Sequence, residues 1–326
     1  MAVAPAITRP VGVILSPDDG AALAARVVVR FHLRAFASQE QPARAGDVEG
    51  VHELRVATRR LRAALRFFAP VLPEKFVEKM RTEVKWLASA IGAVRDLDVL
   101  GQLVAARAPR LEPDVRSALG PVAVYIHDRR AAAHDALVAA LDSARCRRLL
   151  DRLAGFAESM PPRRTQESLG VVAPSLLRPL LRAVLSAGRG IGDDTKPEAL
   201  HRVRVRGKRL RYALETLRGL GGKHVGKMLR RLVALQDLIG DHRDAFTAMT
   251  RLRAYAETAD VPPATILAVG ALVEVFSRRA VKLRRRFPET WRRLDRSRLR
   301  TGLQNELVRR RARRRSPPPR LRATGS

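Results

Sequence analysis

The most regular pattern of hydrophobic positions lies in residues 51–68, VHELRVATRRLRAALRFF. Apolar residues recur at every third or fourth position, which is the spacing of one face of an α-helix. With about 100° between successive residues, leucines fall on one side and arginines on the other. The segment therefore predicts a two-faced helix. Its apolar face comprises Leu54, Thr58, Leu61, Leu65 and Phe68, and its cationic face comprises His52, Arg55, Arg59, Arg62 and Arg66.

Like charges three or four positions apart repel one another along this cationic face. No carboxylate of the same face offsets the repulsion, so we expect an anion from outside the helix to do so. If the segment stood alone, an ordinary solvated surface would be the simpler interpretation.

The pattern occurs twice in the chain. Residues 200–217, LHRVRVRGKRLRYALETL, align with the first copy without a gap. The matched pairs are His52 with His201, Arg55 with Arg204, Arg59 with Lys208, Arg60 with Arg209, and Arg62 with Arg211. Downstream, residues 75–80 match 223–228, and residues 87–100 match 235–248. The second match pairs Arg95 with Arg243 and Asp96 with Asp244. Such self-similarity indicates an internal duplication.

The remaining periodic segments predict further helices and no strand. We expect helices in the first half at 18–38, at 51–68, from after Pro73 to about Ile91, from Pro113 to Leu141, and from Ala144. Residues 39–47 should form a loop, and Gly92 should loosen a turn. The second half should repeat the scheme at 172–188, 197–219, 222–239, 242–258 and 263–286.

These segments suggest an N-terminal arm, two helical halves and a tail. The predicted ranges are 1–17 for the arm, 18–158 for the first half, 159–170 for a linker, 171–290 for the second half, and 291–326 for a disordered basic tail.

Composition supports a helical fold and indicates the cellular compartment. Aromatic residues make up only 4% of the 326 residues, and the abundance of Ala, Leu and Arg favours helices over sheets. Cys146 is the single cysteine, so no intramolecular disulfide can form and a reducing cytoplasm is expected. We see no signal peptide at the start and no run of about 18 apolar residues that would span a membrane.

The formal net charge of +31 has two sources. Residues 278–326 carry nineteen Lys and Arg against three acids, which is about half of the excess. That segment resembles an unstructured polycation. The rest of the excess lies mostly on the periodic helices.

No arrangement of residues in the sequence points to catalysis. A Walker A loop, a GxGxxG motif and a Ser/His/Asp order are all absent from the sequence. Asp96 and Asp244 are expected to pair with basic neighbours or to cap helices, and not to bind a metal. We therefore expect no enzymatic activity, no cofactor and no metal site.

The leading histidine, the arginine helix and the downstream IG..RD segment (Ile91–Asp96 and Ile239–Asp244), all present twice, resemble the conserved-histidine α-helical domain, or CHAD domain. The resemblance covers roughly residues 18–290. It implies an all-α fold of two helical bundles, related by a pseudo-two-fold axis around a basic cavity or groove. It also implies binding of inorganic polyphosphate and association with polyphosphate granules.

The resemblance carries the binding site to fourteen residues of this chain. The primary candidates are His52, Arg55, Arg59, Arg62, His201, Arg204, Lys208 and Arg211. The secondary candidates are Arg60, Arg209, Lys79, Lys227, Arg95 and Arg243. Glu215 stands where Arg66 would predict a cation, and Val233 stands where Lys85 does, which argues against an evenly symmetric site.

Two other functions remain open at this point. A nucleic-acid-binding protein would also be strongly basic, with the tail as a nonspecific contact. The scarcity of aromatics and the placement of charge on two matched helices argue against it. An interaction scaffold with the tail as its sole polyanion contact is the weaker alternative.

Overall fold

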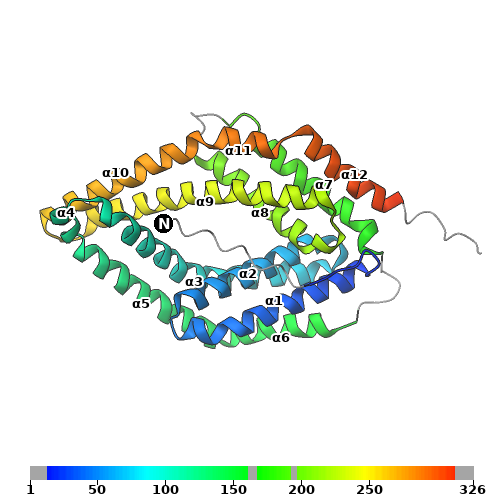
Figure 1. The fold of residues 1–326 in the computed structure, drawn as a ribbon. Helices are drawn as coiled ribbons and strands as arrows, with labels where there is room; N and C mark the ends of the chain where they lie inside the picture. Colours follow the sequence, from blue (N-terminus) through cyan, green and yellow to red (C-terminus); the bar gives the residue numbers. More distant parts are fainter. Residues whose placement is uncertain (1–12, 161–166, 192–196, 313–326) are drawn as a thin grey trace, which may run out of the picture.

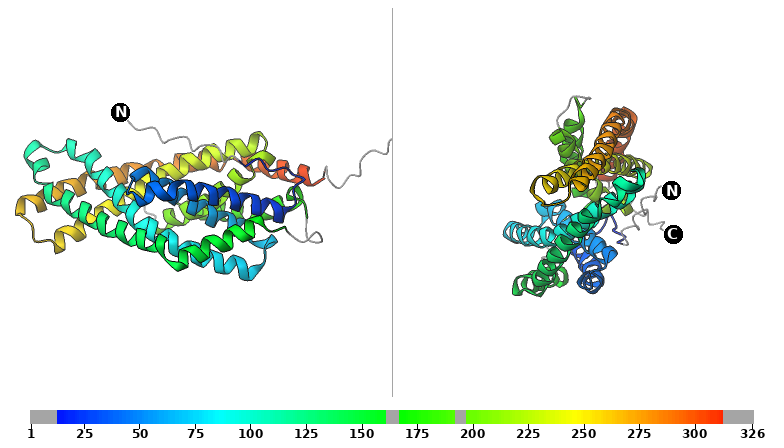
Figure 2. Two further views of the ribbon diagram at one scale, coloured as in Figure 1. Left: turned by 90° about the horizontal axis from the view of Figure 1, so that it is seen from below. Right: turned by 90° about the vertical axis from the view of Figure 1, so that its left-hand side faces the viewer.

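The computed structural model describes residues 13–160, 167–191 and 197–312. These residues form helices, and no strand is present in them beyond one isolated bridge between Gly20 and Ser168. The predicted all-α class is therefore confirmed. Figure 1 shows two layers of helices along an elongated molecule, and Figure 2 shows the same layers from below and from one end.

The first layer holds the helices of the first half, in chain order. These are α1 (Ala21–Arg44), α2 (Val48–Phe67), α3 (Glu74–Arg107), α4 (Pro113–Ser117), α5 (Gly120–Asp142) and α6 (Ala144–Glu158). The second layer holds α7 (Leu169–Gly188), α8 (Pro197–Thr216), α9 (Lys223–Thr258), α10 (Pro263–Arg285), α11 (Phe287–Leu294) and α12 (Ser297–Ala312). Single 3₁₀ turns lie at Ala69–Val71, Ala108–Arg110 and Arg218–Leu220.

Two predicted breaks are wrong because glycine alone does not end a helix. Helix α3 runs through Gly92 and α9 runs through Gly240. Neither glycine has positive φ, and a Cβ at either would meet no heavy atom within 4 Å. The predicted loop at 39–47 is wrong in its first part, since α1 continues through Pro42 to Arg44. The turn itself uses Gly46 at φ 78°, a conformation that glycine adopts at little cost.

Three apolar clusters hold the helices together, and two of them join the halves. One joins α1 and the end of α2 to α7, α8, α9, α11 and α12. A second lies within the first half, around Leu54, Leu65 and Leu87. The third joins α3 and α5 to α9 and α10 at the far end, around Val122 and Phe276. Each half therefore depends on the other for part of its core.

The predicted disordered tail is wrong for residues 291–312. This stretch is helical, and Trp291, Leu294, Leu299 and Leu303 are buried. Glu306 accepts hydrogen bonds from the backbone N–H groups of His224 and Val225 at the start of α9. The few apolar residues are spaced to meet the core although arginines surround them. Residues 313–326 lie outside the described residues.

Helix α7 is long and apolar enough to cross a membrane by length and composition alone. Arg178 and Arg182 interrupt its apolar residues, so it is not the continuous apolar run whose absence the sequence indicated. In the structure α7 packs into the core shared by the two halves, where Leu169, Leu177 and Val184 are at most 2% exposed.

Two glycines provide a matched test of this packing. A Cβ on Gly50 would lie 2.6 Å from Pro42 Cβ and 2.8 Å from the backbone nitrogen of Ala43, whereas a Cβ on Gly92 would lie in open space. We expect Gly50→Ala to lower the free energy of unfolding by about 1–3 kcal/mol. Gly92→Ala should raise it by about 0.5–1 kcal/mol, because alanine favours a helix. Urea unfolding measures both, and changes of the same sign would contradict this close α1–α2 contact.

Candidate functional site

Burial of the leucine face determines where the cations of α2 point. Leu54, Leu61 and Leu65 are at most 3% exposed, which confirms the predicted apolar face. The carboxylate of Asp47 accepts a hydrogen bond from Gly50 N at 2.7 Å and caps the helix. On α8, Val203 and Leu210 are buried in the same way. Because α2 and α8 contact each other, their cationic residues approach across the boundary between the halves.

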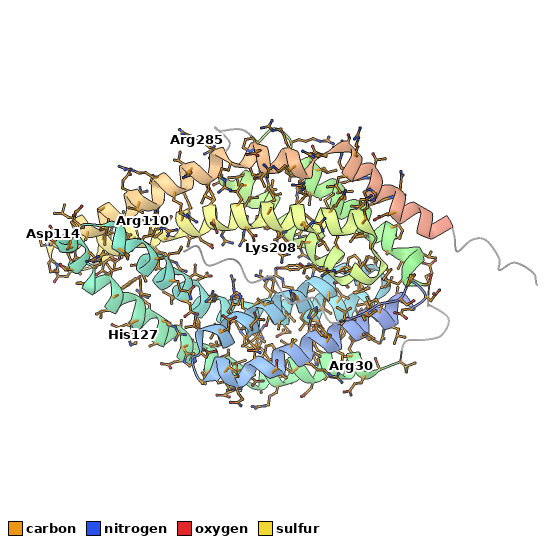
Figure 3. The ribbon with its side chains drawn as sticks, viewed as in Figure 1. Arg30, Arg110, Asp114, His127, Lys208 and Arg285 are labelled. Atoms are coloured by element: carbon orange, nitrogen blue, oxygen red, sulfur yellow. The ribbon has the colours of Figure 1, made fainter. Side chains whose placement is uncertain are left out.

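Six basic residues meet there, and we call them the central cluster. They are Arg55, Arg59 and Arg95 from the first half, and Arg204, Lys208 and Arg243 from the second. Charges of Arg55 and Arg59 lower the pKa of both Arg204 and Lys208, so groups from α2 and α8 share one electrostatic environment. Figure 3 labels Lys208 on the side of α8 that faces the first layer. The guanidinium of Arg59 also lies 5.6 Å from the ring centre of Tyr212 on α8.

Burial destabilises the positive charge of this cluster. It lowers the pKa of Lys208 from 10.5 to about 6, and the charges of Arg59, Arg204, Arg55 and Arg243 add to the effect. Burial also lowers the pKa of Arg55 and Arg204. An anion brought between the halves would reverse these effects, because opposite charge favours the protonated form.

Two carboxylates balance the cluster only in part. Asp96 lies 3.5 Å from Arg55 and 3.7 Å from Arg251, which confirms that it pairs with basic residues. For Asp244, burial raises the pKa although Arg204 and Arg243 lower it. The pKa of Arg204 is lowered at the same time, so the attraction between the two groups does not compensate for their burial.

Some donors of the cluster have no acceptor in the described part of the protein. The Nε atoms of Arg59 and Arg204 are buried without a hydrogen-bond partner. A buried donor without an acceptor costs about 1–3 kcal/mol. Rotation of either guanidinium toward an anionic oxygen between the halves would satisfy these donors.

Both predicted histidines lie beside the central cluster. The pKa of His52 is lowered by burial and then by Arg95, with Glu49 and Glu53 opposing the shift. The pKa of His201 is lowered by burial and then by Arg243, Arg204 and Lys208. Both rings are therefore mostly neutral near pH 7.

The first turns of α2 also bring together potential metal ligands. Single atoms of Glu49, His52 and Glu53 lie within 4.8 Å of one another. A cation bound there would experience repulsion from Arg59 and Arg95, whose charges already disfavour protonation of His52. The carboxylates of Glu49 and Glu53 oppose that repulsion, since they raise the pKa of His52.

A second group of arginines extends the positive charge along α2, and we call it the distal cluster. Its members are Arg62, Arg66, Arg81, Arg206 and Arg209. Burial lowers the pKa of Arg66 to about 10, with further effects from Arg209, Arg81 and Arg62. The rise of about 1.5 Å per residue separates Arg55 from Arg66 by about 16 Å. Positive charge thus follows α2 over three helical turns.

Arg66, Arg81 and Arg206 were not among the predicted site residues. Arg66 has no cationic counterpart in the second copy, where Glu215 replaces it, and the repeat comparison discounted it. Arg81 joins the distal cluster through the packing of α3, α2 and α8, and no spacing in the sequence predicts that contact. Arg206 joins it as the neighbour of Arg209 three positions away on α8.

The predicted residues Arg60 and Arg211 have a structural contact instead. Arg211 pairs with Glu215 at 2.6 Å and donates to the side-chain oxygen of Gln236 at 3.4 Å. Arg60 of α2 lies 4.0 Å from the same Glu215 of α8. Glu215 therefore offsets positive charge at the contact between the two halves.

Lys79 and Lys227 lie apart from the interactions that define the two clusters. Lys79 lines a pocket of about 280 Å³ between α3 and α6, together with Glu83, Arg145, Arg148 and Arg152. Arg145 pairs with Glu83 at 2.6 Å there. Lys227 is exposed on α9. Neither lysine contributes to the lowered pKa values of the central cluster.

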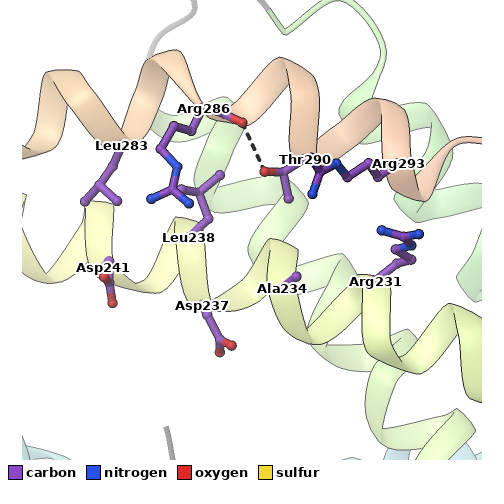
Figure 4. Close-up of a pocket in the computed structure, with 9 residues that line it drawn as sticks. All are labelled: Arg231, Ala234, Asp237, Leu238, Asp241, Leu283, Arg286, Thr290 and Arg293. Carbon is purple, nitrogen blue, oxygen red and sulfur yellow. Dashed lines mark hydrogen bonds between the residues drawn. The ribbon is translucent and has the colours of Figure 1, made fainter. Parts of the chain in front are cut away.

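Another pocket lies between α9, α10 and α11 and holds about 310 Å³ (Figure 4). Leu238, Leu283 and Ala234 supply apolar lining, and Arg231, Arg286 and Arg293 supply charge. Asp241 of this pocket pairs with Arg279 at 2.6 Å. None of the residues predicted to bind polyphosphate lines it.

Comparison with known proteins identifies the family of the chain. The family model described as "CHAD domain" matches residues 27–253. The chain belongs to the CHAD-domain family. As a family, CHAD domains are associated with polyphosphate binding.

Two curated relatives come from Mycobacterium tuberculosis. They are the uncharacterized proteins MT2285, of strain CDC 1551 / Oshkosh, and Rv2226, of strain ATCC 25618 / H37Rv. Each is 29% identical over 265 residues, which is 79% of this chain and 50% of the relative. The CHAD protein described here thus spans about half the length of the curated relatives it matches.

Two solved structures share the fold. The CHAD domain from the plant Ricinus communis has a TM-score of 0.69 and 24% identity, over 91% of this chain and 94% of that one. PptA from Streptomyces chartreusis has a TM-score of 0.63 and 23% identity, over 84% and 99% respectively. At these identities the likeness establishes the fold of the CHAD domain.

Removing the buried amine should stabilise the protein. The native pKa of Lys208 lies below its unfolded value, so the unfolded state holds more protons between about pH 6 and 10.5, and native stability rises with pH in that window. Lys208→Met removes the cost of the buried charge. We expect it to raise the free energy of unfolding at pH 6 by roughly 1–4 kcal/mol.

The gain from Lys208→Met should shrink toward pH 9, where the native amine is neutral. Denaturant unfolding at several pH values measures it, with exposed Lys227→Met as the control. A gain at pH 6 no larger than that of the control would show that the amine is not penalised by its surroundings.

Proposed function

We propose that this CHAD protein binds inorganic polyphosphate between its two halves, through the central and distal clusters. The observation that carries the proposal is the convergence of Arg55 and Arg59 with Arg204 and Lys208 at an interface where burial opposes their charge. A chain of phosphates supplies a negative charge at every unit and has no bases to be read. Guanidinium groups suit it because each can bind phosphate oxygens through two donors.

The proposal includes how the duplicated halves share the ligand. Arg55, Arg59 and Arg95 occupy the same repeat positions as Arg204, Lys208 and Arg243, as a pseudo-two-fold relation between the halves would require. Arg60 lies near Glu215, and Arg66 lies near Arg209. In the repeat, Arg209 is the counterpart of Arg60 and Glu215 is the counterpart of Arg66, so the same pair of positions meets twice. A polyanion that spans both rows gains effective concentration at the second row from binding the first.

The proposed role is binding without a chemical conversion of polyphosphate. The clusters are built mainly from arginine, whose guanidinium does not give up its proton in proteins. We propose that the protein is cytoplasmic and associates with polyphosphate granules, in line with the resemblance of the whole duplicated motif. The longer relatives leave room for partners and activities outside this region.

Loss of either row should weaken binding of long polyphosphate. We expect Arg55→Ala/Arg59→Ala and Arg204→Ala/Lys208→Ala each to raise the dissociation constant at least about tenfold. Each should also reduce the slope of log affinity against log salt, because fewer counterions are released. Titration with size-defined polyphosphate at several salt concentrations measures both, and exposed Lys79→Ala/Lys227→Ala is the matched control. If the control pair weakens binding as much as the row variants do, the site is not between the halves.

Duplex DNA tests the main alternative. A base-free, linear chain should bind these facing rows better than a wide duplex of matched charge, and row variants should change duplex binding less. Equal loss for both ligands would favour a general polyanion-binding surface.

Affinity should increase as pH falls. Free His52, His201 and Lys208 have lowered pKa values, and a bound polyanion raises them, so binding takes up protons. Affinity therefore rises as pH decreases from the bound-state pKa toward the free-state pKa, which is about 6 for Lys208.

Substitutions separate the contributions to this pH dependence. Lys208→Arg keeps the charge at all pH values, so it should bind more tightly than the parent protein at pH 8 and depend less on pH. His52→Gln with His201→Gln should remove the share of this dependence that comes from the histidines. Titration between pH 5.5 and 8.5 measures both effects, and a parent protein with constant affinity would rule out proton uptake.

A further inference from the structure

Lys208 differs chemically from its neighbours in the central cluster. The other five members are arginines, which hold their protons permanently and do not act as nucleophiles. An amine can lose its proton and then has a lone pair on Nζ. The second copy of the repeat thus places one amine where the first copy has Arg59.

The surroundings of Lys208 favour the reactive, neutral amine. Arg55 and Arg59 approach from α2, Arg204 and His201 lie on α8, and Arg243 and Asp244 lie on α9. Burial and the neighbouring guanidinium groups bring the pKa of Lys208 to about 6. Most of this amine is therefore neutral at pH 7.5, whereas an ordinary lysine is almost fully protonated there. Desolvation and adjacent cations are recognised ways to activate a lysine.

The same guanidinium groups can hold the leaving group of an acyl donor. Arg204 lies one turn before Lys208 on α8, and Arg59 of α2 places its guanidinium 5.6 Å from the ring centre of Tyr212, one turn after Lys208. Each of these two arginines has a buried Nε without an acceptor. An acyl phosphate combines a phosphate, which these donors recognise, with an electrophilic carbonyl carbon one bond away. Docking of the phosphate would bring that carbon to the amine and stabilise charge on the departing phosphate.

We propose that Lys208 is a site of acylation by small acyl phosphates. The lone pair of Nζ attacks the carbonyl carbon, and a C–N amide bond forms. The C–O bond to phosphate breaks, and its electron pair leaves with inorganic phosphate. The proton released from Nζ passes to that phosphate or to water, so no oxidant or further reactant is needed.

Acylation and polyanion binding should exclude each other. The amide nitrogen can no longer gain a proton. The acylated cluster therefore lacks the positive charge that Lys208 would acquire when a polyanion binds. A bound polyanion in turn occupies the guanidinium groups and protonates the amine. This consequence rests on the proposed function, whereas the acylation itself requires only that the cluster holds a phosphate group.

The test is peptide-level mass spectrometry of the full chain after incubation with acetyl phosphate at pH 7.5. The exposed lysines Lys75, Lys85 and Lys227 of the same protein are internal controls. We expect Lys208 to be acetylated at least about tenfold faster than these. The Arg59→Gln/Arg204→Gln variant should lose most of this preference, because it loses both the phosphate contacts and part of the cause of the lowered pKa. Acetylation of Lys208 no faster than that of the exposed lysines would overturn the proposal.

An uncharged acetyl donor without a phosphate group tests whether docking of the phosphate causes the preference for Lys208. With N-hydroxysuccinimidyl acetate, the preference for Lys208 over exposed lysines should fall several-fold, and an undiminished preference would overturn the docking of phosphate. Added polyphosphate should protect Lys208 from acetyl phosphate. If Lys208 reacts selectively but polyphosphate gives no protection, the acylation site stands and the proposed polyphosphate site fails.

Discussion

The structure depends on burial of the leucine faces of α2 and α8, whose arginine faces repel each other. Helices α2 and α8 carry rows of arginine that would separate in water, yet their leucine faces lie in apolar clusters that cannot be exposed without unfolding. Full burial of one leucine contributes about 1.5–3 kcal/mol, whereas a like-charge pair on a helix costs only tenths of a kcal/mol. Hydrophobic packing therefore holds the cations close together against their mutual repulsion.

This repulsion appears in the protonation of the side chains. Lysine and histidine respond by losing protons, and arginine cannot respond in this way, so charge persists where arginine stands. Ion pairs with Asp96 and Glu215 reduce the repulsion at two places, and both pairs also link helices of different halves. The site thus combines permanent charge, adjustable charge and a small number of fixed counter-charges. This combination would suit the polyphosphate chain that we propose as the ligand.

Periodicity predicted the helical class, and the repeat together with the family resemblance predicted the six residues of the central cluster, although not that the rows of α2 and α8 meet. Matched spacing in two copies identified Arg55, Arg59, Arg204 and Lys208 before any contact between them was known. Helix ends were less predictable, since Gly92 and Gly240 look like breaks but lie within continuous helices. Arg81 could not be found because it joins Arg66 and Arg209 through contacts between helices, and such contacts leave no trace in spacing along the chain. Residues 291–312 were wrongly predicted to be disordered, because their many arginines outweighed the four apolar side chains that are buried in the structure.

The shared apolar clusters also bear on where the folding unit ends. The region matched by the family model stops at residue 253, but Phe276 of α10 is fully buried against α3, α5 and α9. Trp291 of α11 fills the space above Gly188, and Leu303 of α12 is 1% exposed. A fragment cut at the family boundary would expose the apolar interior at both ends of the molecule. The region matched by the family model is therefore shorter than the packed core of this chain, and truncated proteins made for expression should retain α10, α11 and α12.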